Sequence, residues 1–245
     1  MSRIRTGLCF ISFVLFTGLA AVAQDLTIDQ ILKNNETALG GQEALGKIQT
    51  IRITTRTTVA GAEMEIKGVT TLKRPNLMRT EIAVQGMNVV AGFDGTNAWM
   101  INPQTGPEPQ KIDQALVGNG MESNFQWLSG IKATGGVVEL VGKEDVKGSP
   151  AYKINVVPKT GTSSTYYLDA RTFLPVKVVG KLSSMGMDMQ VESIPSDYKK
   201  VEGIILPHTT EAQVMGQSMQ SKMEYEINMP LDDSIFRMPS AQTVK

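Results

Sequence analysis

Three segments of the sequence alternate apolar and polar residues on both sides of a glycine-containing dipeptide, a pattern that favours antiparallel strands over helices. The dipeptides tested as two-residue turns are Gly61-Ala62, Gln85-Gly86 and Gly216-Gln217. In the first hairpin Ile53 then faces Thr70, and in the third Glu211 faces Lys222. Each test gives one apolar and one polar face, so the sequence predicts three hairpins of the same kind.

Further strand patterns fill most of the remaining chain. They cover residues 137–146, 151–158, 164–168, 174–180 and 187–194. Because twisted sheets with one apolar face curl rather than lie flat, we expect a mainly β (α+β) fold. Its curved antiparallel sheet should form an incomplete barrel of about ten to eleven strands, arranged as one meander. No break in composition indicates a second domain, so residues 24–245 are expected to form a single domain.

Two regions have helical rather than strand spacing. Thr27 and Gln30 have the T-x-x-Q form of a capping box, which predicts an N-terminal helix that ends at Gly40-Gly41, with a short helical piece after it. The second region is an insert of about residues 104–136, where the strand period disappears, Pro107 and Pro109 predict a loop, and two short helical patterns follow. The first of these patterns holds Ile112, Leu116 and Val117. We expect this insert to lie as a lid over the mouth or the concave face of the sheet. The lid residues proposed from these patterns are Leu116, Met121, Phe125, Trp127, Leu128 and Ile131.

The first residues are typical of a secretory signal peptide. Two arginines precede an apolar run over residues 7–20, and Ala21-Val22-Ala23 has the form of a small-x-small cleavage site. The apolar run is short for a membrane span and holds Cys9, the only cysteine. We therefore expect residues 1–23 to be removed, leaving a soluble mature chain without a permanent membrane anchor.

The charge balance and the rare residue types exclude several classes of function. Lys and Arg total 24, as do Asp and Glu, so no surplus of positive charge is present for nucleic acid. The only histidine, His208, points inward beside Tyr225 and has neither a nucleophile motif nor a second imidazole to work with. Asp94, Asp169 and Asp232-Asp233 have the sequence context of turns or caps. We therefore expect no enzyme activity, no metal and no cofactor.

The predicted inner face of the sheet is unusually rich in methionine. The chain has 14 methionines, and several fall on inward positions together with small residues such as Thr55, Gly68 and Ala212. Methionine adapts to guests of varied shape, although it also fills gaps in ordinary cores. The small residues favour an open apolar cavity. The cavity residues proposed are Ile53, Met64, Ile66, Leu72, Met78, Ile82, Val89, Phe93, Met187, Met189, Met219 and Met223.

Arg74 is the one charged residue that strand alternation directs toward this apolar face. Alternation from Ile66 through Leu72 gives it an inward orientation, where an unpaired charge is costly and needs acceptors. Carbonyl groups at the helix ends of the lid insert are candidate acceptors. The alternative is that Pro75 bends the strand end and lets the side chain reach water.

Three motifs together resemble the bacterial outer-membrane lipoprotein-sorting proteins, the LolA-like periplasmic carriers. They are the Lys-Arg-Pro-Asn-Leu run at 73–77, the Asp-Gly…Trp…Asn-Pro run at 94–103 and the segment at 197–207, and residues 232–239 resemble the closing segment of the family. The resemblance implies an incomplete barrel with a helical lid over a hydrophobic cavity that carries acyl chains. It also implies that Arg74 latches the lid in the closed, empty form, and that the protein is periplasmic.

Two functions from different classes follow. The first is a periplasmic carrier that binds the acyl chains of lipids or lipoproteins for sorting to the outer membrane, with an inner-membrane releasing complex and an outer-membrane acceptor as implied partners. The second is an interaction or sensor module on the same scaffold (RseB-like), which would bind a protein partner instead of transporting lipid. Acyl chains found in protein from its native envelope would favour the first.

Overall fold

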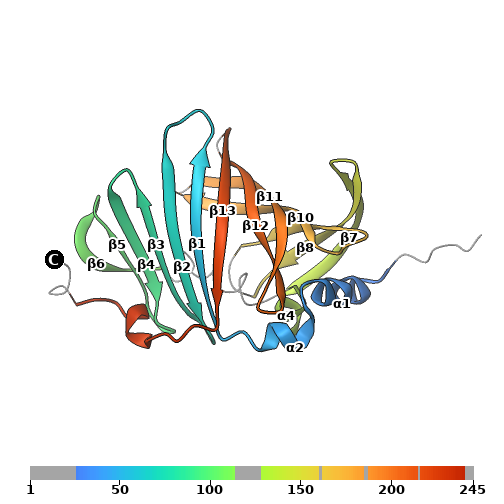
Figure 1. The fold of residues 1–245 in the computed structure, drawn as a ribbon, viewed down its shortest axis with the longest axis horizontal. Coiled ribbons are helices and arrows are strands. Elements are labelled where there is room, and N and C mark those ends of the chain that lie inside the picture. The colour runs from blue at the N-terminus through green and yellow to red at the C-terminus, as the bar shows by residue number, and fades with distance from the viewer. Residues whose placement is uncertain (1–25, 114–127, 160–161, 185–186, 215, 241–245) are drawn as a thin grey trace, which may run out of the picture.

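The computed structural model of the chain describes residues 26–113, 128–159, 162–184, 187–214 and 216–240. These residues form a curved, open antiparallel sheet with a few short helices along its lower edge in the view of Figure 1. The mainly β class and the incomplete barrel expected from the sequence are confirmed. The sheet has 13 strands, more than the ten to eleven expected. No helix in these ranges is long and apolar enough to cross a membrane.

The elements follow one another along the chain with short connections. The helices are α1 (Ile28–Ala38), α2 (Gly41–Gly46), α4 (Leu128–Ala133) and the 3-10 helix η1 (Asp233–Phe236). The first six strands are β1 (Thr50–Val59), β2 (Glu65–Lys73), β3 (Leu77–Val84), β4 (Met87–Phe93), β5 (Ala98–Asn102) and β6 (Gly106–Ile112). The others are β7 (Val137–Val146), β8 (Ser149–Val157), β9 (Ser164–Asp169), β10 (Pro175–Ser184), β11 (Met187–Val201), β12 (Ile204–Val214) and β13 (Gln217–Ile227).

The strand order shows that the sheet consists of two meanders joined side by side. The order is β6-β5-β4-β3-β2-β1-β13-β12-β11-β10-β9-β8-β7, so the first and last strands pair in the middle. The expected single meander in sequence order is therefore wrong in one respect, because its two ends are hydrogen-bonded to each other. Among the described strands β6 and β7 are the two edges of the sheet, and the chain that connects them includes α4.

The hairpin registers test the turn assignments directly. The first two hairpins have the expected register, with Ile53 opposite Thr70, and Gln85-Gly86 forms the second turn with a positive φ at both residues. The third register is wrong by two positions: Glu211 lies opposite Gln220, not Lys222, because the connection is residues 215–216. A shift of two residues leaves every side chain on its predicted face.

Two of the helical predictions are confirmed and one is wrong. Thr27 and Gln30 form the predicted capping box, with Thr27 N donating to Gln30 Oε1 at 2.8 Å, and α2 follows as expected. Ile112, however, lies in strand β6 and not in a helical lid pattern. The prolines in β6 suggested a loop, but an edge strand needs only one row of ladder hydrogen bonds and tolerates them.

The three described α-helices pack on one face of the sheet, here called the inner face, and form two buried clusters with it. The α2 core contains Leu39, Leu45, Ile48, Ile51, Leu72, Met78, Phe93, Ala98, Ile204 and Leu206. The α1–α4 core contains Ile31, Leu32, Leu128, Ile131, Val138, Tyr152, Ile154, Val156 and Leu168. Gly40, the residue just before α2, lets the helical segment approach the sheet closely. Its φ is 124°, and a Cβ there would lie 2.5 Å from the Gly203 carbonyl oxygen.

The C-terminal segment crosses the opposite, outer face of β3–β5. Trp99 is fully buried there, and its Nε1 donates a hydrogen bond to the carbonyl oxygen of Phe236 at 2.8 Å. Arg79 Nη1 donates to the carbonyl of Ile235 at 3.1 Å. Asp232 caps η1 by accepting from Ser234 N, as its sequence context predicted. Trp99 therefore faces outward, and Met100 beside it faces inward.

Candidate functional site

The strands β13 and β1–β5 lie side by side (Figure 1), and their register arranges the inner-face residues in rows that run across the sheet. The row nearest the helices, the buried row, is Ile227, Ile51, Leu72, Met78, Phe93 and Ala98. Its residues Leu72, Met78 and Phe93 are at most 5% exposed. This row belongs to the α2 core, with Ile227 partly buried at its margin, and forms the closed floor of the inner face.

The inner face opens within two rows of that floor. The middle row is Tyr225, Ile53, Thr70, Thr80, Ala91 and Met100, and the open row is Met223, Thr55, Gly68, Ile82 and Val89. Most of these residues are half-buried, and Ile82 is 40% exposed. We call the middle and open rows, together with Thr57, Ile66, His208, Thr210, Ala212, Met219 and Ser221 beside them, the open inner face.

Small residues keep the centre of the open row low, meaning that few side-chain atoms project from the sheet there. A Cβ on Gly68 would lie 2.5 Å from Thr55 Oγ1, so the threonine side chain occupies the space that a larger residue in β2 would take. Thr55 Oγ1 also donates to the Gly68 carbonyl at 3.3 Å. The larger apolar side chains of Ile82, Val89 and Met223 stand on both sides of this low centre.

The structure divides the predicted cavity residues among three environments. Leu72, Met78 and Phe93 are part of the α2 core. The residues that the structure brings together on the open inner face are Ile53, Ile66, Ile82, Val89, Met219 and Met223. Met64 lies just before β2, where its sulfur accepts from Gln85 Nε2 at 3.5 Å. The strand β11 contains Met187 and Met189, but their side chains lie outside the described part of the structure.

The predicted lid residues are only partly described. Leu128 and Ile131 lie in α4, buried in the α1–α4 core. Leu116, Met121, Phe125 and Trp127 lie outside the described residues. Their place over the inner face stays a prediction.

Arg74 uses a carbonyl acceptor, as an inward arginine requires, and this acceptor lies in the segment that follows α2. Arg74 Nε donates to the carbonyl oxygen of Ile48 at 2.7 Å, and its backbone N donates to Gln49 O at 2.9 Å. The side chain is half-buried. These bonds join the end of β2 to the segment between α2 and β1, and the latch role of Arg74 stays a prediction.

Polar side chains on the open inner face are paired with one another, a feature that the sequence analysis missed. The hydroxyls of Thr57 and Ser221 are 2.7 Å apart, and those of Thr70 and Thr80 are 3.2 Å apart. The Tyr225 hydroxyl donates to the Pro207 carbonyl at 2.7 Å, and burial raises the pKa of Tyr225 to about 12. The threonines at inward strand positions were the sequence signal from which these polar pairs could have been predicted.

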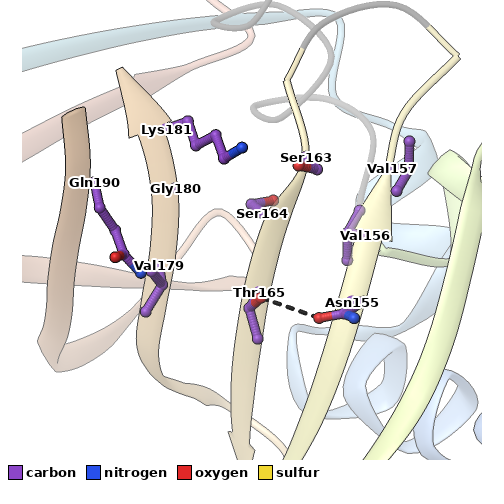
Figure 2. A pocket seen from close by; sticks show the side chains of 10 residues that line it. All are labelled: Asn155, Val156, Val157, Ser163, Ser164, Thr165, Val179, Gly180, Lys181 and Gln190. Atoms are coloured by element: carbon purple, nitrogen blue, oxygen red, sulfur yellow. Dashed lines mark hydrogen bonds between the residues drawn. The ribbon is translucent and has the colours of Figure 1, made fainter. Parts of the chain in front are cut away.

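Two pockets of about 620 Å³ each lie along the sheet, and most of their side chains belong to the outer face. Figure 2 shows the one between β8 and β11, where Thr165 donates to Asn155 at 3.0 Å beside Val179, Lys181 and Gln190. The second pocket includes Thr58, Glu211 and Gln220. Both have many polar side chains, and the second also includes Ala212 and Met219 of the open inner face.

The acidic residues considered as catalysts have structural roles in turns. Asp94 accepts hydrogen bonds from Asn97 N at 2.7 Å and Thr96 N at 2.9 Å, and these bonds hold its pKa below the ordinary value. Burial raises the pKa of Asp169, but hydrogen bonds from Thr172 and Arg171 outweigh it and leave the pKa lowered. These contacts confirm the turn assignments.

Comparisons with known proteins find similarity in structure and not in sequence. No protein-family model matches the chain, and no curated protein matches it by sequence. A LolA superfamily protein from Nitrosomonas europaea is similar with a TM-score of 0.59 and 15% identity, over 87% of this chain and 98% of that one. A putative outer membrane lipoprotein-sorting protein domain from Vibrio parahaemolyticus gives 0.53 and 13%, over 84% and 94%. A DUF1329 family protein from Desulfovibrio piger gives 0.54 and 11%, over 90% and 100%.

Proposed function

We propose, from the LolA-like fold that this chain has, that it is a periplasmic carrier which binds the acyl chains of lipids or lipoproteins on its open inner face. Sorting of that cargo to the outer membrane is the purpose we assign to binding. One observation carries the proposal: Ile51 of the buried row and Ile82 of the open row lie on the same face of the sheet, and Ile51 is 3% exposed whereas Ile82 is 40% exposed.

The energetics of acyl transfer explain why such a surface suits the task. Each buried methylene is worth about 0.8 kcal/mol, so a chain of about 15 carbons needs about 12 kcal/mol of replacement burial to leave a membrane. Ile53, Ile66, Ile82 and Val89 supply branched apolar surface for that burial. Closed cores offer no room for a guest, so a half-buried apolar face is the part of the sheet that can accept one.

Release matters as much as binding for a carrier. Met219 and Met223 contribute flexible thioether side chains, which adapt to a guest without the rigid fit that would hold it too tightly. We propose that the protein acts by binding alone and not by catalysis, in keeping with the turn roles of Asp94 and Asp169. Its place in the periplasm rests on the signal-like sequence of residues 1–23.

Lipid extraction from the protein purified from its native envelope tests the proposal. We expect mass spectrometry to detect acyl chains, and we expect the purified protein to bind diphenylhexatriene, a hydrocarbon probe that fluoresces in apolar surroundings. Ile82→Glu should weaken probe binding at least tenfold, because it places a carboxylate on the open row. Val157→Glu is the matched control, since Val157 is 47% exposed on the outer face. A protein that carries no acyl chain and binds no probe would contradict the carrier function and favour the interaction module.

A further inference from the structure

His208 holds a buried nitrogen that has no hydrogen-bond partner among the described residues. The atom is Nε2, and it is the only buried side-chain nitrogen or oxygen in the described part of the chain with this property. The imidazole packs edge-on against the ring of Tyr225, with centroids 5.2 Å apart and an interplanar angle of 76°. Folded proteins rarely leave such an atom unpaired, so its lack of a partner needs an explanation.

The polar groups around His208 are already engaged with one another. The Tyr225 hydroxyl is held at 2.7 Å by the Pro207 carbonyl, and Thr57 and Ser221 share a hydrogen bond of 2.7 Å. The contact between Tyr225 and the imidazole is one of ring against ring, with the two planes nearly perpendicular. The neighbouring side chains therefore leave the hydrogen-bonding capacity of Nε2 unused.

The position of His208 places this unused capacity next to the proposed site. Thr209 of β12 pairs with Lys222 of β13, and continuation of this register puts His208 opposite Met223 of the open row. Alternation along β12 directs His208 to the same face as Thr210, which pairs with Ser221. The adjacent Met223 has a flexible side chain that can move to admit a ligand atom.

Building on the proposed carrier function, we propose that His208 Nε2 binds the polar group to which the cargo's acyl chain is joined. Imidazole Nε2 donates or accepts according to its tautomer, so it suits an ester or amide carbonyl, an amide N–H or a hydroxyl. A plain hydrocarbon has none of these groups and leaves Nε2 unpaired. The ligand class is therefore an acyl chain that bears a hydrogen-bonding linkage, as in a glyceride or in the acylated terminus of a lipoprotein. Sites built around a buried polar group discriminate against analogues that lack its partner.

Competition binding with two kinds of ligand tests this assignment. Diphenylhexatriene reports on the apolar surface alone. The competitors that displace it are monolauroylglycerol and a palmitoylated Cys-Ser dipeptide, and both carry groups that can hydrogen-bond to His208. His208→Phe, which keeps a ring and removes the nitrogen, should change the affinity for the competitors more than the affinity for diphenylhexatriene, which has no hydrogen-bonding group. It should weaken the better of the two competitors about threefold to tenfold, the effect of one lost hydrogen bond. The competitor whose affinity falls more in His208→Phe identifies the linkage as that of a glyceride or that of a lipopeptide.

Two further variants keep the test independent of folding and of the carrier function. His208→Gln retains a hydrogen-bonding side chain and should preserve most of the competitor affinity, and Thr210→Val is the matched control on the same face. His208→Phe should also raise the melting temperature of the empty protein, because it removes the unpaired nitrogen. If the wild-type protein binds the probe but His208→Phe weakens competitors no more than Thr210→Val does, the His208 assignment is wrong and the carrier function stands. If no ligand binds the wild-type protein, both are wrong.

Discussion

Ile51 and Ile53 are two residues apart on the same face of β1, yet Ile51 is 3% exposed within the α2 core while Ile53 is half-buried at its margin. The boundary between the closed floor and the open inner face passes between them. Because both side chains are isoleucine, the difference comes from the covering helix and not from the residue type. The boundary separates residues that stabilise the fold from residues that are free to contact a ligand.

This boundary predicts opposite effects of two matched truncations. Ile51→Ala should lower the free energy of unfolding by about 2–5 kcal/mol, because it leaves a cavity in a closed core. Ile82→Ala should cost less than about 1 kcal/mol, since Ile82 is 40% exposed, yet it should weaken diphenylhexatriene binding. Urea unfolding and probe titration of both variants check this. Equal stability losses would mean that the open row is as closed as the buried row.

The C-terminal segment is predicted to stabilise the sheet without taking part in binding. Phe236 is fully buried, and Trp99 donates a hydrogen bond to its carbonyl on the outer face. Phe236→Ala should cost about 3–5 kcal/mol of unfolding free energy while probe affinity stays unchanged. Asp233→Asn is the control: it breaks only an exposed ion pair with Lys73 and should cost less than about 1 kcal/mol. A loss of probe affinity in Phe236→Ala would show that the segment supports the ligand site.

Arg74→Leu is predicted to loosen the junction that follows α2 and, if the arginine is the latch, the lid sequence as well. The substitution removes the bond from Nε to the Ile48 carbonyl. Hydrogen exchange of empty protein should accelerate in the peptide over residues 41–49 and in that over 114–127. Arg56→Leu, at an exposed position on the polar face of β1, is the control. Faster exchange in the first peptide only would leave Arg74 a structural role and contradict the latch.

Asp169 is predicted to make stability depend on acid pH. Its carboxylate accepts bonds from Arg171 N, Thr172 N and the Thr172 hydroxyl, and its folded pKa lies below the ordinary 3.8. A lowered folded pKa gives stability that is present above the unfolded value and lost as the pH falls through the folded one. Asp169→Asn should therefore cost about 1–3 kcal/mol at neutral pH. The difference in unfolding free energy between the variant and the wild-type protein should narrow in acid. A constant difference across the pH range would contradict the carboxylate's role.

The strand faces could be predicted from the sequence because alternation encodes them directly. Gln85-Gly86 was also predictable, since a two-residue turn with positive φ favours these residue types. The register of Glu211 was not, because placing Gly216 first or second in the turn shifts the pairing by two and leaves both faces unchanged. Edge strand β6 was missed because its prolines resemble a loop.

The remaining features depend on contacts between residues far apart in the chain. Nothing in the alternation of β1 indicates that its second partner is β13. The outward orientation of Trp99 depends on Phe236, and the acceptor of Arg74 is set by where α2 ends. The division of the predicted cavity residues into core and open surface likewise follows from helix packing, which strand periodicity does not report.

Photochemical labelling of the binding surface tests the central claim most directly. A palmitic acid analogue with a diazirine in mid-chain should attach to peptides that contain Ile82, Val89, Met219 or Met223, and unlabelled palmitate should compete with it. Ile82→Glu should abolish this labelling, whereas Val157→Glu should not. Labelling confined to the outer-face pocket around Val179 and Lys181, or labelling that palmitate does not reduce, would contradict the claim that the open inner face binds acyl chains.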